Sequence, residues 1–269
     1  MRKQHSFLKL VSNLALGLVL ICASTVSAQT NRASSATKTE TSPVAPYPSE
    51  NELLPGKGPM QTWADFPKVW MQRRTEFWQH RQEDHGAIVF LGDSIIQLWN
   101  NLARAFPDFK VANRGIGGDT TRGVLYRLDE DIIDLKPKAV VLLIGTNDIG
   151  LGAKPEDVAD NINAIIVALE KSNPKMPIIF CKIMPRNDGQ ERHLAETIEQ
   201  VNTLVSVAVK DNPQVTVCDT WNIYVDDDGN FKQSEFLGPV HPNEIGYAKW
   251  AKALMTIFTK LNLAGSSTM

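Results

Sequence analysis

Cysteine is scarce in this 269-residue sequence, which contains three, and net charge is small. The length excludes a disulfide-stapled miniprotein and is sufficient for a substantial hydrophobic core. The formal net charge is −2. The first 28 residues contain Arg2, Lys3 and Lys9 but no acidic residue, so without them 25 bases face 30 acids and the net charge is −5. A mildly acidic protein binds nucleic acid poorly, and we therefore expect no nucleic-acid partner.

A hydrophobic run long enough to cross a membrane is also missing near the N-terminus. The apolar run Leu14–Ala23 would span about 15 Å as a helix, roughly half of a bilayer core. Basic residues precede this run, and Val26 and Ala28 occupy the −3 and −1 positions of a signal-peptidase site. We therefore predict that residues 1–28 are a cleaved secretory signal. The mature protein would be exported, periplasmic or secreted, with no stable membrane span.

Motifs for metal and nucleotide binding are absent from the sequence. The five histidines form no H-E-x-x-H pair, and residues 226–230 lack the spacing of a calcium loop. In GIGGDT, Thr120 replaces the third glycine of a dinucleotide-binding loop. Ile96 likewise replaces the second glycine of the G-x-S-x-G elbow of α/β-hydrolases. We predict no metal and no cofactor.

The composition divides the chain into a linker and a domain. Residues 29–60 are rich in Ser, Thr, Pro and Ala without an apolar period, which is typical of a disordered linker. The domain is predicted over residues 61–265, and helical spacing of apolar residues between Phe66 and Phe77 indicates a helix at its start. Cys181 and Cys218 lie in apolar runs. We expect two buried thiols, and the sequence leaves open a disulfide between them.

Apolar, strand-like runs alternate with helical patterns throughout this domain. Strands that are buried on both faces read as nearly continuous apolar runs, so the pattern predicts a parallel sheet covered by helices on both sides. Ligands bind such sheets beyond the carboxyl ends of the strands, where the polar and glycine-rich segments of this sequence collect. The expected strands are 87–92, 110–115, 139–145, 177–184 and 215–221, and the expected helices are 95–106, 120–132, 155–171, 192–209 and 243–261.

Ser94 follows the first strand-like run and Gly92, at a turn into a predicted helix. A serine at such a turn can present its hydroxyl above the sheet as a nucleophile, and the alternative is that Asp93 or Ser94 serves only as a helix cap.

Four ordered blocks, FLGDSI, NRGIGGDTT, LIGTND and VHPNEIGY, resemble those of the SGNH (GDSL-type) esterase and lipase family over residues 86–260. The stretch GIGGDTTRGVLYRL resembles the platelet-activating-factor acetylhydrolase-like branch of that family.

This resemblance implies a fold and a set of site residues. The fold would be a flavodoxin-like three-layer α/β/α sandwich with a five-stranded parallel sheet. Ser94 would be the nucleophile and His241 the general base of ester hydrolysis. The backbone N–H groups of Ser94 and Gly118 and the side-chain amide of Asn147 would form the oxyanion hole, in which fixed donors stabilise the negative charge of the tetrahedral intermediate.

One position departs from the family pattern. The family has an aspartate three residues before the histidine, and this sequence has Gly238 there. A substitute could come from Glu235, from the acidic run Asp226, Asp227 and Asp228, or from a backbone carbonyl, and the sequence does not decide among them. We expect an exported serine esterase for short acyl groups, with an acetylated carbohydrate or a lysophospholipid-type ester as substrate. The alternative is a catalytically impaired ligand-binding protein with the same fold.

Overall fold

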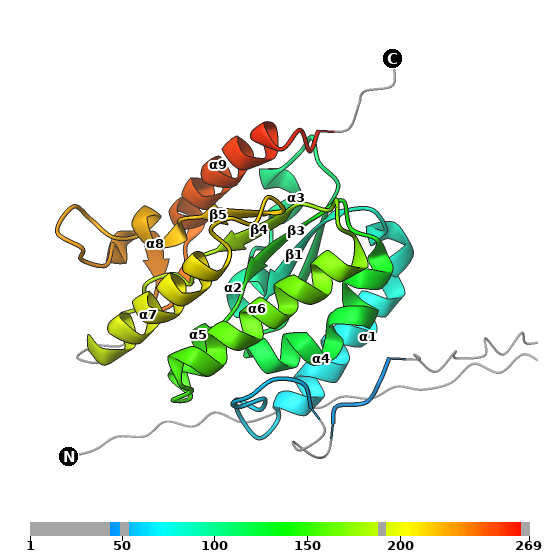
Figure 1. The fold of residues 1–269 in the computed structure, drawn as a ribbon, viewed down its shortest axis with the longest axis horizontal. Helices are drawn as coiled ribbons and strands as arrows, with labels where there is room; N and C mark the ends of the chain where they lie inside the picture. The colour runs from blue at the N-terminus through cyan, green and yellow to red at the C-terminus, as the bar shows by residue number, and fades with distance from the viewer. Residues whose placement is uncertain (1–43, 49–53, 188–191, 265–269) are drawn as a thin grey trace, which may run out of the picture. The chain divides into compact units, whose positions relative to one another are not determined.

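A computed structural model describes residues 44–48, 54–187 and 192–264, and the predicted signal at 1–28 lies outside them. Its main feature is a parallel sheet in the order β2-β1-β3-β4-β5 (Figure 1). The strands are β1 (Ile88–Gly92), β2 (Val111–Gly115), β3 (Ala139–Leu143), β4 (Ile178–Cys181) and β5 (Val215–Cys218). This sheet confirms the predicted α/β class and its five parallel strands.

Helices cover both faces of the sheet. Figure 1 shows α4 and α6 in front of the strands. The buried residues of one face pack with α4 (Thr121–Asp131), α6 (Pro155–Ser172) and α7 (Arg192–Ala208), and those of the other face pack with α2 (Ser94–Gln97), α3 (Leu102–Ala105) and α9 (Glu244–Lys260). The remaining elements are α1 (Phe66–Asp84), η2 (Ile133–Leu135), α5 (Thr146–Gly150), α8 (Thr220–Ile223), η3 (Gln233–Glu235), β6 (Phe236–Leu237) and β7 (His241–Pro242).

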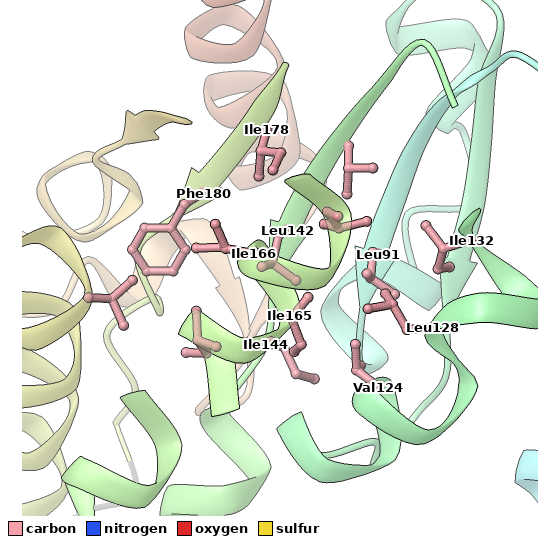
Figure 2. Packing of buried hydrophobic residues seen from close by; sticks show 14 of the residues in the cluster. Leu91, Val124, Leu128, Ile132, Leu142, Ile144, Ile165, Ile166, Ile178 and Phe180 are labelled. Atoms are coloured by element: carbon pink, nitrogen blue, oxygen red, sulfur yellow. The ribbon is translucent and has the colours of Figure 1, made fainter. Parts of the chain in front are cut away.

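The two faces of the central strands belong to two separate hydrophobic clusters. Successive strand side chains point to opposite faces, so Val89 and Leu91 join one cluster while Ile88 and Phe90 join the other. Figure 2 shows the first cluster, in which Leu142 and Phe180 of the sheet lie near Ile166. Because both faces are buried, the strands read as continuous apolar runs and not as alternating ones. The three-layer arrangement is thus confirmed.

The segment predicted as one helix over residues 95–106 forms two short helices, α2 and α3. Between them the chain turns so that Trp99 is buried in the second cluster, where its ring stacks on that of Trp250 at 4.8 Å between centroids. The side-chain amide of Asn113 donates to the Ile96 carbonyl at 2.6 Å, in addition to the Trp99 N–H at 3.1 Å, and so helps to close the end of α2. Tertiary packing of the indole therefore interrupts a helical sequence pattern.

Parts of the segment predicted as a linker are packed on the domain. Residues 44–48 and 54–60 are described, and Val44, Leu54 and Met60 are buried. For these residues the linker prediction is wrong, because a few separated apolar side chains and backbone hydrogen bonds to the domain fix the chain without any periodic pattern. The rest of residues 29–60 lies outside the described residues.

Cys181 and Cys218 are buried free thiols on adjacent strands, paired in the β4–β5 register. Burial raises the pKa of Cys181 well above its ordinary value, and the neighbouring Cys218 adds to this effect.

Among the described residues, no helix combines the length and apolar character that a bilayer crossing requires.

Candidate active site

Ser94 is the first residue of α2, directly after β1. The strand must end in glycine, because a Cβ on Gly92 would lie 2.1 Å from the Leu143 carbonyl oxygen. Asp93 caps α2, with its Oδ1 accepting from the Ile95 N–H at 2.9 Å. The capping role therefore falls to Asp93, and the Ser94 hydroxyl is left to face another group.

That group is the imidazole of His241. The Ser94 Oγ and His241 Nε2 atoms are 2.9 Å apart, although 147 residues separate them in sequence. His241 belongs to a short antiparallel ribbon in which β7 pairs with β6, and Leu237 is its partner. Asn243 then caps α9 by accepting from the N–H groups of Ile245 and Gly246. The ribbon and the helix start together fix the backbone that carries the imidazole.

The surroundings of His241 favour its uncharged form, which can accept a proton. Burial lowers its pKa below the usual 6.5, and the positive charge of Arg186 lowers the pKa further. The Arg186 guanidinium is held at the Thr146 carbonyl, where its Nη1 donates at 2.9 Å. At neutral pH the imidazole is therefore uncharged, and its Nε2 is available to take the Ser94 proton.

None of the candidate carboxylates contacts His241 among the described residues. Glu235 is buried and forms an ion pair with Lys249. Asp226 closes its own turn by accepting from the backbone N–H groups of Asp228 and Asn230. The side chains of Asp227 and Asp228 are exposed and form no described hydrogen bond, and the Gly238 carbonyl accepts from Gln233. The histidine is thus held by its backbone and not by an identified carboxylate.

Gly118 lies in a tight turn between β2 and α4. The Asp119 N–H donates to the Ile116 carbonyl at 3.0 Å, and Gly118 has a φ of +81°, the value that type II turns place at their third residue. None of the described residues accepts a hydrogen bond from the Gly118 N–H. The same is true of the Ser94 N–H at the start of α2. Both groups therefore remain able to donate to a ligand.

The Asn147 amide is oriented by the same loop. Asn147 is the second residue of α5. Its Nδ2 donates to the Asp119 carbonyl at 2.9 Å, which leaves one amide hydrogen for another acceptor. Since Ser94, Gly118 and Asn147 follow β1, β2 and β3, the sheet brings all three to its carboxyl edge at the reversal of strand order.

Buried charged groups beneath this edge were missed by the sequence analysis. Arg127 and Asp119 are fully buried and form an ion pair at 2.8 Å. Asp148 accepts from the N–H and hydroxyl of Thr121, and burial raises its pKa to about 7. Burial also raises the pKa of Asp93 to about 7. Charged side chains are usually exposed, so nothing in the sequence marked these residues as interior.

The described residues include no group of three or more His, Cys, Asp or Glu side chains that could hold a metal ion. Separately, Ser94 supplies a hydroxyl, His241 a neutral imidazole, and the neighbouring loops N–H donors. This combination suits nucleophilic attack on a carbonyl group, with stabilisation of the oxyanion that forms.

Known proteins resemble this chain over most of its domain. Residues 90–249 match the GDSL-like Lipase/Acylhydrolase family. Platelet-activating factor acetylhydrolase IB subunit alpha1 of Homo sapiens is 31% identical over 200 residues, covering 71% of this chain and 84% of the relative, and subunit alpha2 of Homo sapiens is 32% identical over 199 residues with the same coverages. The crystal structure of a GDSL-like lipase from Bacteroides thetaiotaomicron is 23% identical, has a TM-score of 0.62 and covers 71% of this chain and 97% of its own. The chain therefore belongs to the GDSL-like lipase/acylhydrolase, or SGNH, family.

Proposed function

We propose that this protein is a serine esterase that hydrolyses short-chain acyl esters, with acetyl as the preferred group. The observation that supports this most directly is the 2.9 Å contact between the Ser94 Oγ and the His241 Nε2. A nucleophile and a base within hydrogen-bonding reach are the minimal machinery of acyl transfer. The two human relatives are both acetylhydrolases by name, which supports the choice of acetyl.

In the proposed reaction the Ser94 oxygen attacks the ester carbonyl while His241 takes its proton. The resulting oxyanion accepts hydrogen bonds from the N–H groups of Ser94 and Gly118 and from the Asn147 amide. Collapse of this intermediate expels the alcohol, which receives the proton from His241, and leaves an acyl group on Ser94. Water activated by His241 then attacks the acyl group and releases the acid and the free serine.

The substrate proposed is an acetylated carbohydrate or a lysophospholipid-type ester, met outside the cytoplasm. The signal-peptidase pattern of residues 1–28 supports export to the periplasm or the medium. Short acyl groups are supported by the absence of a long apolar insertion between the four sequence blocks, since such a segment would be needed to cover a fatty chain.

The test is hydrolysis and covalent labelling of purified residues 29–269. We expect p-nitrophenyl acetate to be cleaved with a higher kcat/KM than the octanoate ester, because the site has no described cover for a long chain. A fluorophosphonate should modify Ser94, located by mass spectrometry of the peptide. A folded protein that is neither labelled nor active would instead support the ligand-binding alternative.

Gly238 provides the discriminating substitution between an active and an impaired site. A Cβ at this position meets no atom within 4 Å, and the φ of +67° is one that aspartate tolerates better than most residues. We expect Gly238→Asp to raise kcat about tenfold, because a carboxylate there would stabilise the imidazolium that forms during attack. Steady-state kinetics with p-nitrophenyl acetate would measure this.

Gly229→Asp is the matched control for that substitution. Gly229 is exposed and has a φ of +80°, and a Cβ at this position would likewise meet no atom within 4 Å. Equal rates for both variants and the parent would show that His241 needs no carboxylate at residue 238.

A further inference from the structure

The segment of residues 54–63, which we call the N-terminal strap, is hydrogen-bonded to the loop that carries Gly118. The Arg122 Nη1 donates to the Gly58 carbonyl at 3.1 Å, and the Thr120 hydroxyl donates to the Pro59 carbonyl at 3.0 Å. The strap lies outside residues 90–249, which match the family. These contacts place it against the candidate oxyanion hole although it is distant in sequence.

Two strap residues contact Gly118 itself. The Thr62 hydroxyl donates to the Gly118 carbonyl at 3.1 Å. The Trp63 ring packs so closely that a Cβ on Gly118 would lie 2.1 Å from its Cζ3. The indole is held in turn by Phe66, edge to face at 5.2 Å, and is 43% exposed. Trp63 contacts Gly118, whereas Trp70 is buried in the core and the Trp78 ring lies under the Arg81 guanidinium.

The orientation of the Gly118 N–H depends on this turn. In a β-turn the peptide between the two central residues can face either way, and a positive φ at the third residue selects one orientation. The Gly117 N–H donates to the Gln97 side chain. The Gly118 carbonyl accepts from Thr62, and Trp63 packs on Gly118, so the peptide units before and after the Gly117–Gly118 peptide are both held.

We propose that Thr62 and Trp63 are positioning residues that aim the Gly118 N–H at the substrate oxygen. This inference rests on the proposed esterase function for its kinetic consequence. Neither residue acts on the ester directly, since both act through the Gly118 peptide. Because the oxyanion forms only as the reaction proceeds, a misplaced donor weakens transition-state binding more than substrate binding.

The kinetic test uses Thr62→Val, Thr62→Ser and Trp63→Ala in the mature chain. We expect Thr62→Val to lower kcat about tenfold with KM changed less than twofold, a smaller effect than the roughly 10²- to 10³-fold loss on removing an oxyanion donor. Trp63→Ala should also lower kcat. Thr62→Ser should keep the kcat of the parent, because serine retains the hydroxyl. Thr75→Val is the control, since the Thr75 hydroxyl donates only within its own helix, to Met71.

A second measurement does not depend on activity. Gly117–Gly118 is the only pair of adjacent glycines in the sequence. In protein labelled with carbonyl-¹³C, ¹⁵N-glycine, an HNCO spectrum therefore selects the Gly118 amide alone. We expect this resonance to shift or double in Thr62→Val and Trp63→Ala, and to keep its parent position in Thr62→Ser and Thr75→Val.

The two measurements separate the possible failures. Loss of kcat together with a moved Gly118 resonance supports the proposal. A parent-like resonance and parent-like kcat in Thr62→Val would overturn it. If the parent protein cleaves no ester, the proposed function fails, while the Gly118 resonance still decides whether Thr62 and Trp63 set the geometry of that peptide.

Discussion

Alanine at Ser94, at His241 or at both positions is expected to lower kcat for p-nitrophenyl acetate to nearly the same level, about 10⁴-fold or more below the parent. The Ser94 hydroxyl and the imidazole are 2.9 Å apart, and in the proposed mechanism they act as one nucleophile–base pair. Once either is missing, the other has no partner in the attack. The double variant should therefore be no slower than the worse single variant.

Ser172→Ala and His80→Ala are the matched controls. The Ser172 hydroxyl donates to the Leu169 carbonyl, and the exposed His80 lies beside Glu83. Both should keep the parent rate. If the losses at Ser94 and His241 multiplied in the double variant, the two residues would be acting independently, and the acyl-serine mechanism would be refuted.

Replacing Arg127 with methionine is expected to lower the free energy of unfolding by about 3–5 kcal/mol. Arg127 is fully buried, pairs with Asp119 at 2.8 Å and donates to the Gly92 and Arg114 carbonyls. Its removal would leave the Asp119 carboxylate buried without its counter-ion. Burial already raises the pKa of Asp119 while Arg127 opposes this rise, so the variant would favour the protonated acid.

Urea unfolding at neutral pH would measure this loss, with Arg104→Met as the exposed control. The sign of the pH dependence also follows. In the folded variant the pKa of Asp119 would lie above the already raised pKa of the folded parent, so the deficit of the variant relative to the parent should grow as the pH rises above the parent's folded-state value. A deficit below about 1 kcal/mol would show that water or other groups replace the guanidinium.

The sheet was predictable from the sequence because strands that are buried on both faces appear as continuous apolar runs. Val140 and Val141 point to opposite faces, yet both are buried, so β3 reads as an apolar run. Helices with one buried face, such as α6, leave a helical period. The pattern failed over residues 95–106, where burial of Trp99 breaks the helix, since a single long-range contact leaves no periodic mark.

The candidate site was predictable only in part. Ser94, Gly118, Asn147 and His241 stand in four local motifs, and the structure brings Ser94 and His241 into contact. Their catalytic roles remain proposals. That none of the candidate carboxylates contacts His241 among the described residues was not predictable, because it depends on how the ribbon around Gly238 folds.

The strap shows why the remaining residues escaped prediction. Thr62 and Gly118 are 56 positions apart, and their contact is a single hydroxyl on a carbonyl. Residues 54–60 of the strap were predicted as linker because Ser, Thr, Pro and Ala dominate residues 29–60. Composition describes whether a segment can form a core of its own, and it does not describe whether the segment can pack on an existing one.

The adjacent thiols of β4 and β5 allow opening of the sheet to be measured through their chemical reactivity. Cys181 and Cys218 are buried in neighbouring strands, and the raised pKa of Cys181 keeps that sulfur in the unreactive thiol form. Cys22, the third cysteine, falls within the predicted signal. In residues 29–269, which lack Cys22, the rate of alkylation by a maleimide would therefore measure separation of the two strands and report global unfolding without an engineered probe.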